Sequence, residues 1–137
     1  MMKIITLTIF LLLWMPTLQA KQCTLGSFTD PKLYLSYTYG SQAATSFKVS
    51  CDHAYGIRFS SENLRDSSGN SYVTNGVNKL RTRMTISGAG NNLWNVSIPQ
   101  SASSNNKYVI FVQLAERPSA LTTAGTYTDR IYIDLAF

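Results

Sequence analysis

The chain has 137 residues, 45% of them hydrophobic, and a formal net charge of +5 at pH 7. Its length suits one ordinary domain with a single core. The basic excess is mild and scattered, and no aromatic-and-basic binding motif accompanies it, so the composition argues against nucleic acid as a partner.

The first twenty residues have the pattern of a secretory signal peptide. Lys3 precedes an apolar run over residues 4–15, and small residues follow up to Ala20. The run is shorter than the roughly 20 residues that a membrane-spanning helix needs. We therefore expect residues 1–20 to be a signal peptide cleaved after Ala20, with a retained signal anchor as the alternative. Residues 21–137 would then form a single exported domain.

The chain has two cysteines, Cys23 and Cys51. In an exported protein such an even pair predicts one disulfide, which would close a loop of about 29 residues and stabilise the fold by roughly 3–4 kcal/mol. The only histidine is His53, so a fourth metal ligand is lacking and we expect neither a metal nor another cofactor. A disulfide would also remove the thiolate that a Cys51–His53 pair needs for catalysis, so we do not expect an enzyme.

Strand patterns recur along residues 21–137, and no window has sustained helical periodicity. Turn clusters at 65–71, 87–92 and 101–106 separate several of these segments. Seven or eight short strands at such spacing are typical of an antiparallel β-sandwich, so we predict an all-β, Ig-like sandwich. Alternation predicts strands over 32–40, 45–51, 55–60, 79–87, 93–99, 107–115 and 127–137.

Two of these predicted strands have distinctive patterns. Segment 107–115 is apolar on both faces, which predicts a central strand covered on both sides. Segment 79–87 alternates cleanly, with Leu80, Thr82, Met84 and Ile86 pointing inward. Its outward residues Lys79, Arg81 and Arg83 are the closest basic cluster of the chain. A solvated strand face is the favoured interpretation of this cluster, and contact with an acidic surface polymer is the alternative.

The many aromatic residues permit two interpretations. They could line a sugar-binding surface, but packing in the core and on sheet faces is favoured, because tyrosine and tryptophan are common in strands. A glycosylation sequon at Asn95 falls in the predicted strand 93–99. The aromatic residues weighed are Tyr34, Tyr37, Tyr39, Tyr55, Tyr72, Trp94, Tyr108, Tyr127 and Tyr132.

The last predicted strand is strongly alternating, with an apolar row at Ile131, Ile133, Leu135 and Phe137. The sequence offers no further strand to pair beside it. An exposed apolar edge invites strand addition from another chain. Two interpretations remain open: an incomplete sandwich that lacks its final strand, or an ordinary sandwich that ends on this one.

The segment GTYTDRIYIDLAF resembles the C-terminal signature of the spore coat protein U domain family, whose members are subunits of archaic chaperone–usher pili. The matching features are Gly125, Tyr127 and Asp129, then the apolar row, then the terminal aromatic Phe137. The signal peptide, the cysteine spacing and the size of the domain also fit. Residues 80–94 resemble the family's pattern only loosely.

The resemblance implies an Ig-like fold lacking its last strand and a role as a structural subunit of a surface pilus. A periplasmic chaperone would lend a strand beside Ile131, Ile133, Leu135 and Phe137, and the Phe137 carboxylate would lie near the chaperone's basic anchor. At the outer-membrane usher, the N-terminal extension of another pilus subunit would replace the chaperone's strand. The protein would pass through the periplasm to the cell surface, where it could contact a host or abiotic surface.

One feature departs from the family. Its polymerising members have a donor segment of some ten to sixteen residues before the first cysteine, whereas only Lys21 and Gln22 would precede Cys23 after cleavage. Such a chain accepts a strand but donates none, so we expect a tip or terminal subunit. The alternative function is a stand-alone secreted β-sandwich that binds a surface glycan or another ligand.

Overall fold

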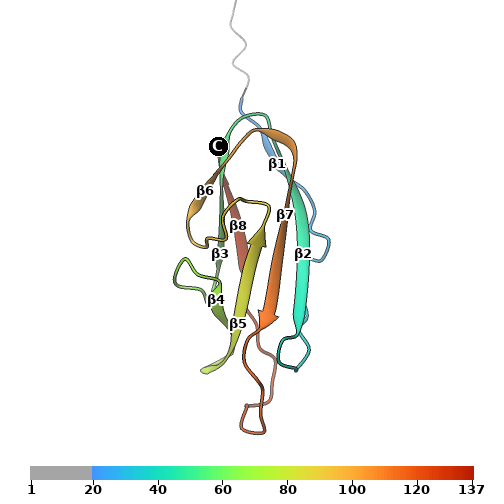
Figure 1. Ribbon diagram of the computed structural model, residues 1–137, viewed down its shortest axis with the longest axis vertical. Coiled ribbons are helices and arrows are strands. Elements are labelled where there is room, and N and C mark those ends of the chain that lie inside the picture. The colour runs from blue at the N-terminus through green and yellow to red at the C-terminus, as the bar shows by residue number, and fades with distance from the viewer. Residues whose placement is uncertain (1–19) are drawn as a thin grey trace, which may run out of the picture.

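Eight antiparallel strands and no helix make up residues 20–137, the part of the chain described by the computed structural model (Figure 1). The all-β sandwich class is confirmed. Residues 1–19 of the predicted signal peptide lie outside the described residues. The strands are β1 (Cys23–Leu25), β2 (Gln42–Cys51), β3 (Tyr55–Ser61), β4 (Asn70–Asn75), β5 (Asn78–Ser87), β6 (Ser97–Gln100), β7 (Ser103–Leu114) and β8 (Ile131–Ala136).

The strands form two sheets. The larger sheet has the order β1-β2-β7-β5-β4, and the smaller one has the order β6-β3-β8. In the larger sheet β7 is central, as its apolar sequence predicts. Strand β8 ends the smaller sheet, with β3 as its only paired neighbour there. Within residues 20–137 no helix is long and apolar enough to cross a membrane.

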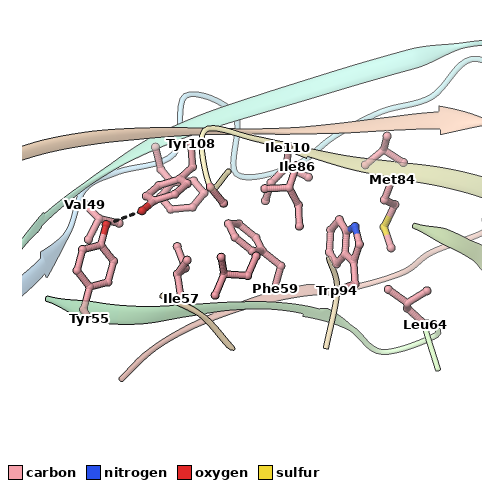
Figure 2. Packing of buried hydrophobic residues seen from close by; sticks show 14 of the residues in the cluster. Val49, Tyr55, Ile57, Phe59, Leu64, Met84, Ile86, Trp94, Tyr108 and Ile110 are labelled. Carbon is pink, nitrogen blue, oxygen red and sulfur yellow. Dashed lines mark hydrogen bonds between the residues drawn. The ribbon is translucent and has the colours of Figure 1, made fainter. Parts of the chain in front are cut away.

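Aromatic side chains fill the space between the two sheets (Figure 2). Trp94 and Phe59 are fully buried, and the Phe59 ring lies 6.0 Å from both the Trp94 ring and the Tyr108 ring. The hydroxyls of Tyr55 and Tyr108 share a hydrogen bond, and the Tyr108 hydroxyl also donates to Gln100 Oε1 at 2.8 Å. Burial removes the Tyr108 hydroxyl from water and raises its pKa well above the ordinary value. Each fully buried aromatic contributes roughly 1.5–3 kcal/mol of hydrophobic stabilisation.

Segment 32–40 is not a strand, so that prediction is wrong. Leu33 and Leu35 are half-buried against the core, whereas Tyr37 and Tyr39 are exposed. Residues just before this segment already satisfy the outer edge of β2, because Gly26 N–H donates to Lys48 O and Thr29 N–H to Ser46 O. The alternating pattern therefore arises because two leucines of a loop, Leu33 and Leu35, pack against the core.

The prediction for segment 93–99 is only half correct, since β6 begins at Ser97. Asn95, the first residue of the sequon, has a φ of 59°, in the left-handed region, and lies two residues before β6. The Asn95 side chain holds this turn by donating to Asp66 O at 2.7 Å. The turn interrupts the alternating pattern that the sequence suggested for residues 93–99. Val96 is therefore exposed, whereas Trp94 and Ile98 are buried.

The predicted cover on both faces of β7 is also wrong. Tyr108, Ile110 and Val112 are buried, but Phe111 on the opposite face is 40% exposed. Among the described strands the smaller sheet covers one face of the larger sheet only. The strand β1 and the strand β4 were not predicted, because three residues and six mostly polar residues give almost no periodic signal.

The predicted disulfide between Cys23 and Cys51 is present, and the two residues lie directly opposite one another in the β1–β2 pair. We expect the Cys23→Ala/Cys51→Ala variant to lose about 3–4 kcal/mol of unfolding free energy, since its unfolded chain is no longer cross-linked. Chemical denaturation of the purified, oxidised protein measures this loss. Reductant should destabilise the wild type alone, and an equal effect on the variant would contradict the assignment.

Candidate functional site

The free edge of β8 is the candidate functional site. Ile131, Ile133 and Leu135 point toward the core but remain half-buried, whereas Tyr132 on the other face is 47% exposed. These three are the apolar row singled out in the sequence. Their side chains contact the core without being fully covered, so apolar surface is left accessible along the edge.

The backbone of the same three residues also points to the free edge. Glu62 N–H donates to Arg130 O at 2.8 Å, so Glu62 and Arg130 form a hydrogen-bonded pair between the β3 and β8 segments. Hydrogen-bonded and non-hydrogen-bonded pairs alternate along an antiparallel ladder. The pairs Ser61–Ile131, Phe59–Ile133 and Ile57–Leu135 are therefore the non-hydrogen-bonded ones. Their β8 members direct their N–H and C=O groups away from β3.

Half-buried apolar residues also occur near the start of the domain. Phe28, Leu33 and Leu35 pack against the core without full cover, and the Phe28 ring lies 5.1 Å from the buried Phe47 ring. They come from the segment that follows β1. Apolar residues from both ends of the described chain therefore pack against the core and remain partly exposed to solvent.

Phe137 follows β8 and is 59% exposed. Its ring lies 5.9 Å from the ring of His53, which belongs to the β2–β3 turn. His53 Nδ1 contacts the Asp52 carboxylate, and this hydrogen bond lowers the pKa of Asp52. His53 is half-buried between these neighbours.

The motif residues Gly125, Tyr127 and Asp129 lie where the chain crosses between the sheets. Thr128 makes an isolated antiparallel bridge with Thr74 of β4, in the larger sheet, and β8 in the smaller sheet begins three residues later. Gly125 has a φ of 142° and its Cα lies against the Asn75 side chain, so a larger residue would be strained there. The Tyr127 hydroxyl donates to Thr123 O at 2.6 Å and holds the preceding loop.

Asp129 fixes the start of β8. Its Oδ1 accepts hydrogen bonds from Asn63 N–H at 3.1 Å and from Arg130 N–H at 2.8 Å. Oδ2 is buried and has no hydrogen-bond partner within residues 20–137. Burial raises the pKa of Asp129 above its ordinary value of 3.8, and the nearby Ser61 side chain and the two backbone N–H groups oppose this rise only in part.

The sequence singled out Asp129 but not its partner Asn63. Asn63 also donates through Nδ2 to Tyr72 O at 2.9 Å and to Thr128 O at 3.2 Å. This one side chain therefore ties β4 to the crossover segment. Local sequence around Asn63 resembles an ordinary loop, so only the long-range contact identifies its role.

No group of three His, Cys, Asp or Glu side chains in residues 20–137 is placed to hold a metal ion. Two open hollows of the described surface, one lined by residues of β5 and of the connection after β7, the other by residues of β2 and β7 and the segment after β1, do not include the β8 row. What distinguishes the β8 edge is therefore its unpaired backbone together with its half-covered apolar side chains.

No protein-family model matches the sequence, and no curated protein matches it either. The fold is similar to that of a chain in a solved complex of Acinetobacter baumannii. That structure is described as the CsuC–CsuE chaperone–tip adhesion subunit pre-assembly complex from archaic chaperone–usher Csu pili. The TM-score is 0.56 at 13% sequence identity, and the match covers 86% of this chain and 40% of the other. The likeness thus establishes a fold found in a pilus assembly complex.

We expect Asp129→Asn to change how stability depends on pH. Because the folded pKa of Asp129 is raised, the folded state binds its proton more tightly than the unfolded state, so this group's contribution falls as pH rises above about 4. The variant keeps an Oδ1 acceptor and should lack that fall. Urea unfolding at several pH values from about 4 to 7 tests this. A wild type and variant with parallel pH profiles would contradict it.

Proposed function

We propose that this protein is a structural subunit of a chaperone–usher surface pilus and that β8 accepts a strand from another chain. The observation that carries the proposal is the coincidence at Ile131, Ile133 and Leu135. Each has its backbone groups directed to the free edge and its side chain half-covered over the core. An added strand would form hydrogen bonds with these backbone groups and would cover these side chains.

Strand addition has a clear physical basis at this edge. Main-chain hydrogen bonds supply affinity that depends little on sequence, and alternate side chains supply specificity by entering the apolar core. The donor strand would need apolar residues at every second position. In this view the sandwich is incomplete without its partner, and the row formed by Ile131, Ile133, Leu135 and Phe137 is the interface.

The fold likeness to a chain from the Csu chaperone–adhesin complex supports this class of function. The Cys23–Cys51 disulfide supports an oxidising compartment. The proposed partners are a periplasmic chaperone, an outer-membrane usher and other pilus subunits. The protein would belong to the spore coat protein U domain family, pass through the periplasm to the cell surface and act by assembly rather than as an enzyme.

Strand acceptance is tested by co-expression with the chaperone encoded by the same bacterium. We expect Ile133→Asp to weaken chaperone capture at least tenfold, because strand addition would bury an unpaired carboxylate. Tyr132→Asp is the matched control, since it adds the same charge to the same strand on its exposed face. Equal capture of wild type and Ile133→Asp would refute the proposal.

A second test uses the wild-type protein, so its result does not depend on whether a variant folds. Amide hydrogen exchange of the complex should show increased protection at Ile131, Ile133 and Leu135, whose N–H groups lack a ladder partner in β3. Amides of the central strand β7 provide the internal control. Unchanged exchange at these three amides in a chaperone-bound sample would place the chaperone elsewhere.

The finer part of the proposal is a tip or terminal position in the pilus. It rests on the predicted cleavage after Ala20, which leaves two residues before Cys23 and hence no donor strand. Mass spectrometry of the exported protein should find Lys21 as its first residue. A mature N-terminus ten or so residues further upstream would supply a donor segment and contradict the terminal position.

A further inference from the structure

The outward face of the larger sheet carries a strong segregation of charge. Its strands contain no aspartate or glutamate, and all seven acidic residues of the chain lie outside them. The same strands carry five basic residues, and each of these is exposed. They point outward because their neighbours in sequence point into the core. We call this surface the basic face, and its residues are Lys48, Lys79, Arg81, Arg83 and Lys107.

The arrangement on the basic face is electrostatically unfavourable in the absence of a partner. Lys48 on β2 lies directly opposite Lys107 on β7, and like charges at such cross-strand positions are destabilising. On β5, Arg81 lies about 7 Å from the basic residue on either side of it along the strand. Within residues 20–137 none of the five side chains has a carboxylate within ion-pairing distance, although Glu116 Oε2 accepts a hydrogen bond from the Arg81 backbone N–H at 2.9 Å. A polyanion would relieve this repulsion.

The shape and chemistry of the face suit a carbohydrate chain. Phe111 and Tyr72 expose about two fifths of their surface there, and such rings can pack against the C–H face of a sugar. Phe111 lies between the small residues Ala44 and Thr85 on the flanking strands, which keeps its surroundings flat. Lys79 Nζ lies 5.3 Å from the centre of the Tyr72 ring.

One end of the face has a hollow with matching polar groups. Lys48 and Lys107 line it together with Ser27, Thr29 and Ser46. Cations beside hydroxyl groups can bind both the carboxylate and the hydroxyls of an acidic sugar. This end of the basic face could therefore hold a single sugar unit while the β5 row follows the chain.

We propose that the basic face binds an acidic polysaccharide. The disulfide indicates a compartment outside the cytoplasm, and this favours a surface polysaccharide over a nucleic acid as the polyanion. The site lies on the larger sheet, whereas the strand-acceptor edge belongs to the smaller sheet. Polysaccharide binding at this site therefore goes beyond the proposed function, and a chaperone bound along β8 would leave the basic face accessible.

The test uses the exported protein as isolated, together with any chaperone that co-purifies. The probes are alginate (a polymer of uronic acids), neutral dextran and random-sequence duplex DNA. We expect binding to alginate that weakens between about 50 and 200 mM salt, as multiple charge contacts require. Arg81→Gln/Arg83→Gln should weaken it roughly tenfold, because two of the five charges are lost.

The matched control is Lys32→Gln/Arg65→Gln, which removes the same net charge from exposed loop positions outside the face. Its affinity for alginate should stay close to that of the wild type. Equal losses in both variants would overturn the proposal, as would dextran binding as tight as alginate binding. Tighter binding to DNA than to alginate would overturn it too, by assigning the face to nucleic acid. If Arg81→Gln/Arg83→Gln does not fold, Lys48→Gln/Lys107→Gln serves in its place.

Discussion

A backbone N–H or C=O group that is removed from water needs a hydrogen-bond partner. In this protein the backbone groups of β8 that face β3 have such partners, and those on its other edge have no strand beside them. Strand β3 pairs with alternate residues of β8, and the remaining backbone groups face outward beside half-covered apolar side chains. The rest of the fold holds this edge in place. The aromatic core fixes β3, and the crossover at Asp129 fixes where β8 begins. The proposed strand acceptance follows from this one unpaired edge.

The crossover has a second consequence, because it links the two sheets through few contacts. Asn63 and the Thr74–Thr128 bridge connect β4 of the larger sheet to the segment that leads into β8. The buried carboxylate of Asp129 lies beside them, and its Oδ2 has no hydrogen-bond partner in the part of the chain that the structure describes. A buried, incompletely satisfied acid at the start of the edge strand makes the position of β8 sensitive to this one side chain. The motif residues therefore act on the edge without belonging to it.

Sequence reasoning succeeded where the periodic signal was long and both faces had distinct environments. Segment 79–87 alternates without interruption, and its four inward residues are all buried. It failed where a local turn or a loop imitated a strand. Asn95 adopts a left-handed conformation, so Val96 and Ile98 do not face the same way, although their spacing predicted that they would. Segment 32–40 has an alternating sequence because two leucines of a loop pack against the core. The apolar row of β8 was recognisable from sequence, but its outward backbone required the register with β3, and the role of Asn63 required a contact across 66 positions.

The disulfide also determines how the domain would carry a mechanical load. Cys23 lies at the first residue of β1, a strand of only three residues that would peel from the sheet easily. The bond to Cys51 passes any pull on the chain before Cys23 directly to the end of β2. Strand β2 is paired with the central β7 from Gln42 to Cys51, so the pull acts along a long ladder instead of one short edge strand. A pull at the start of the domain would thus act on the β2–β7 ladder of the larger sheet, whereas a partner strand would attach at β8 in the smaller sheet.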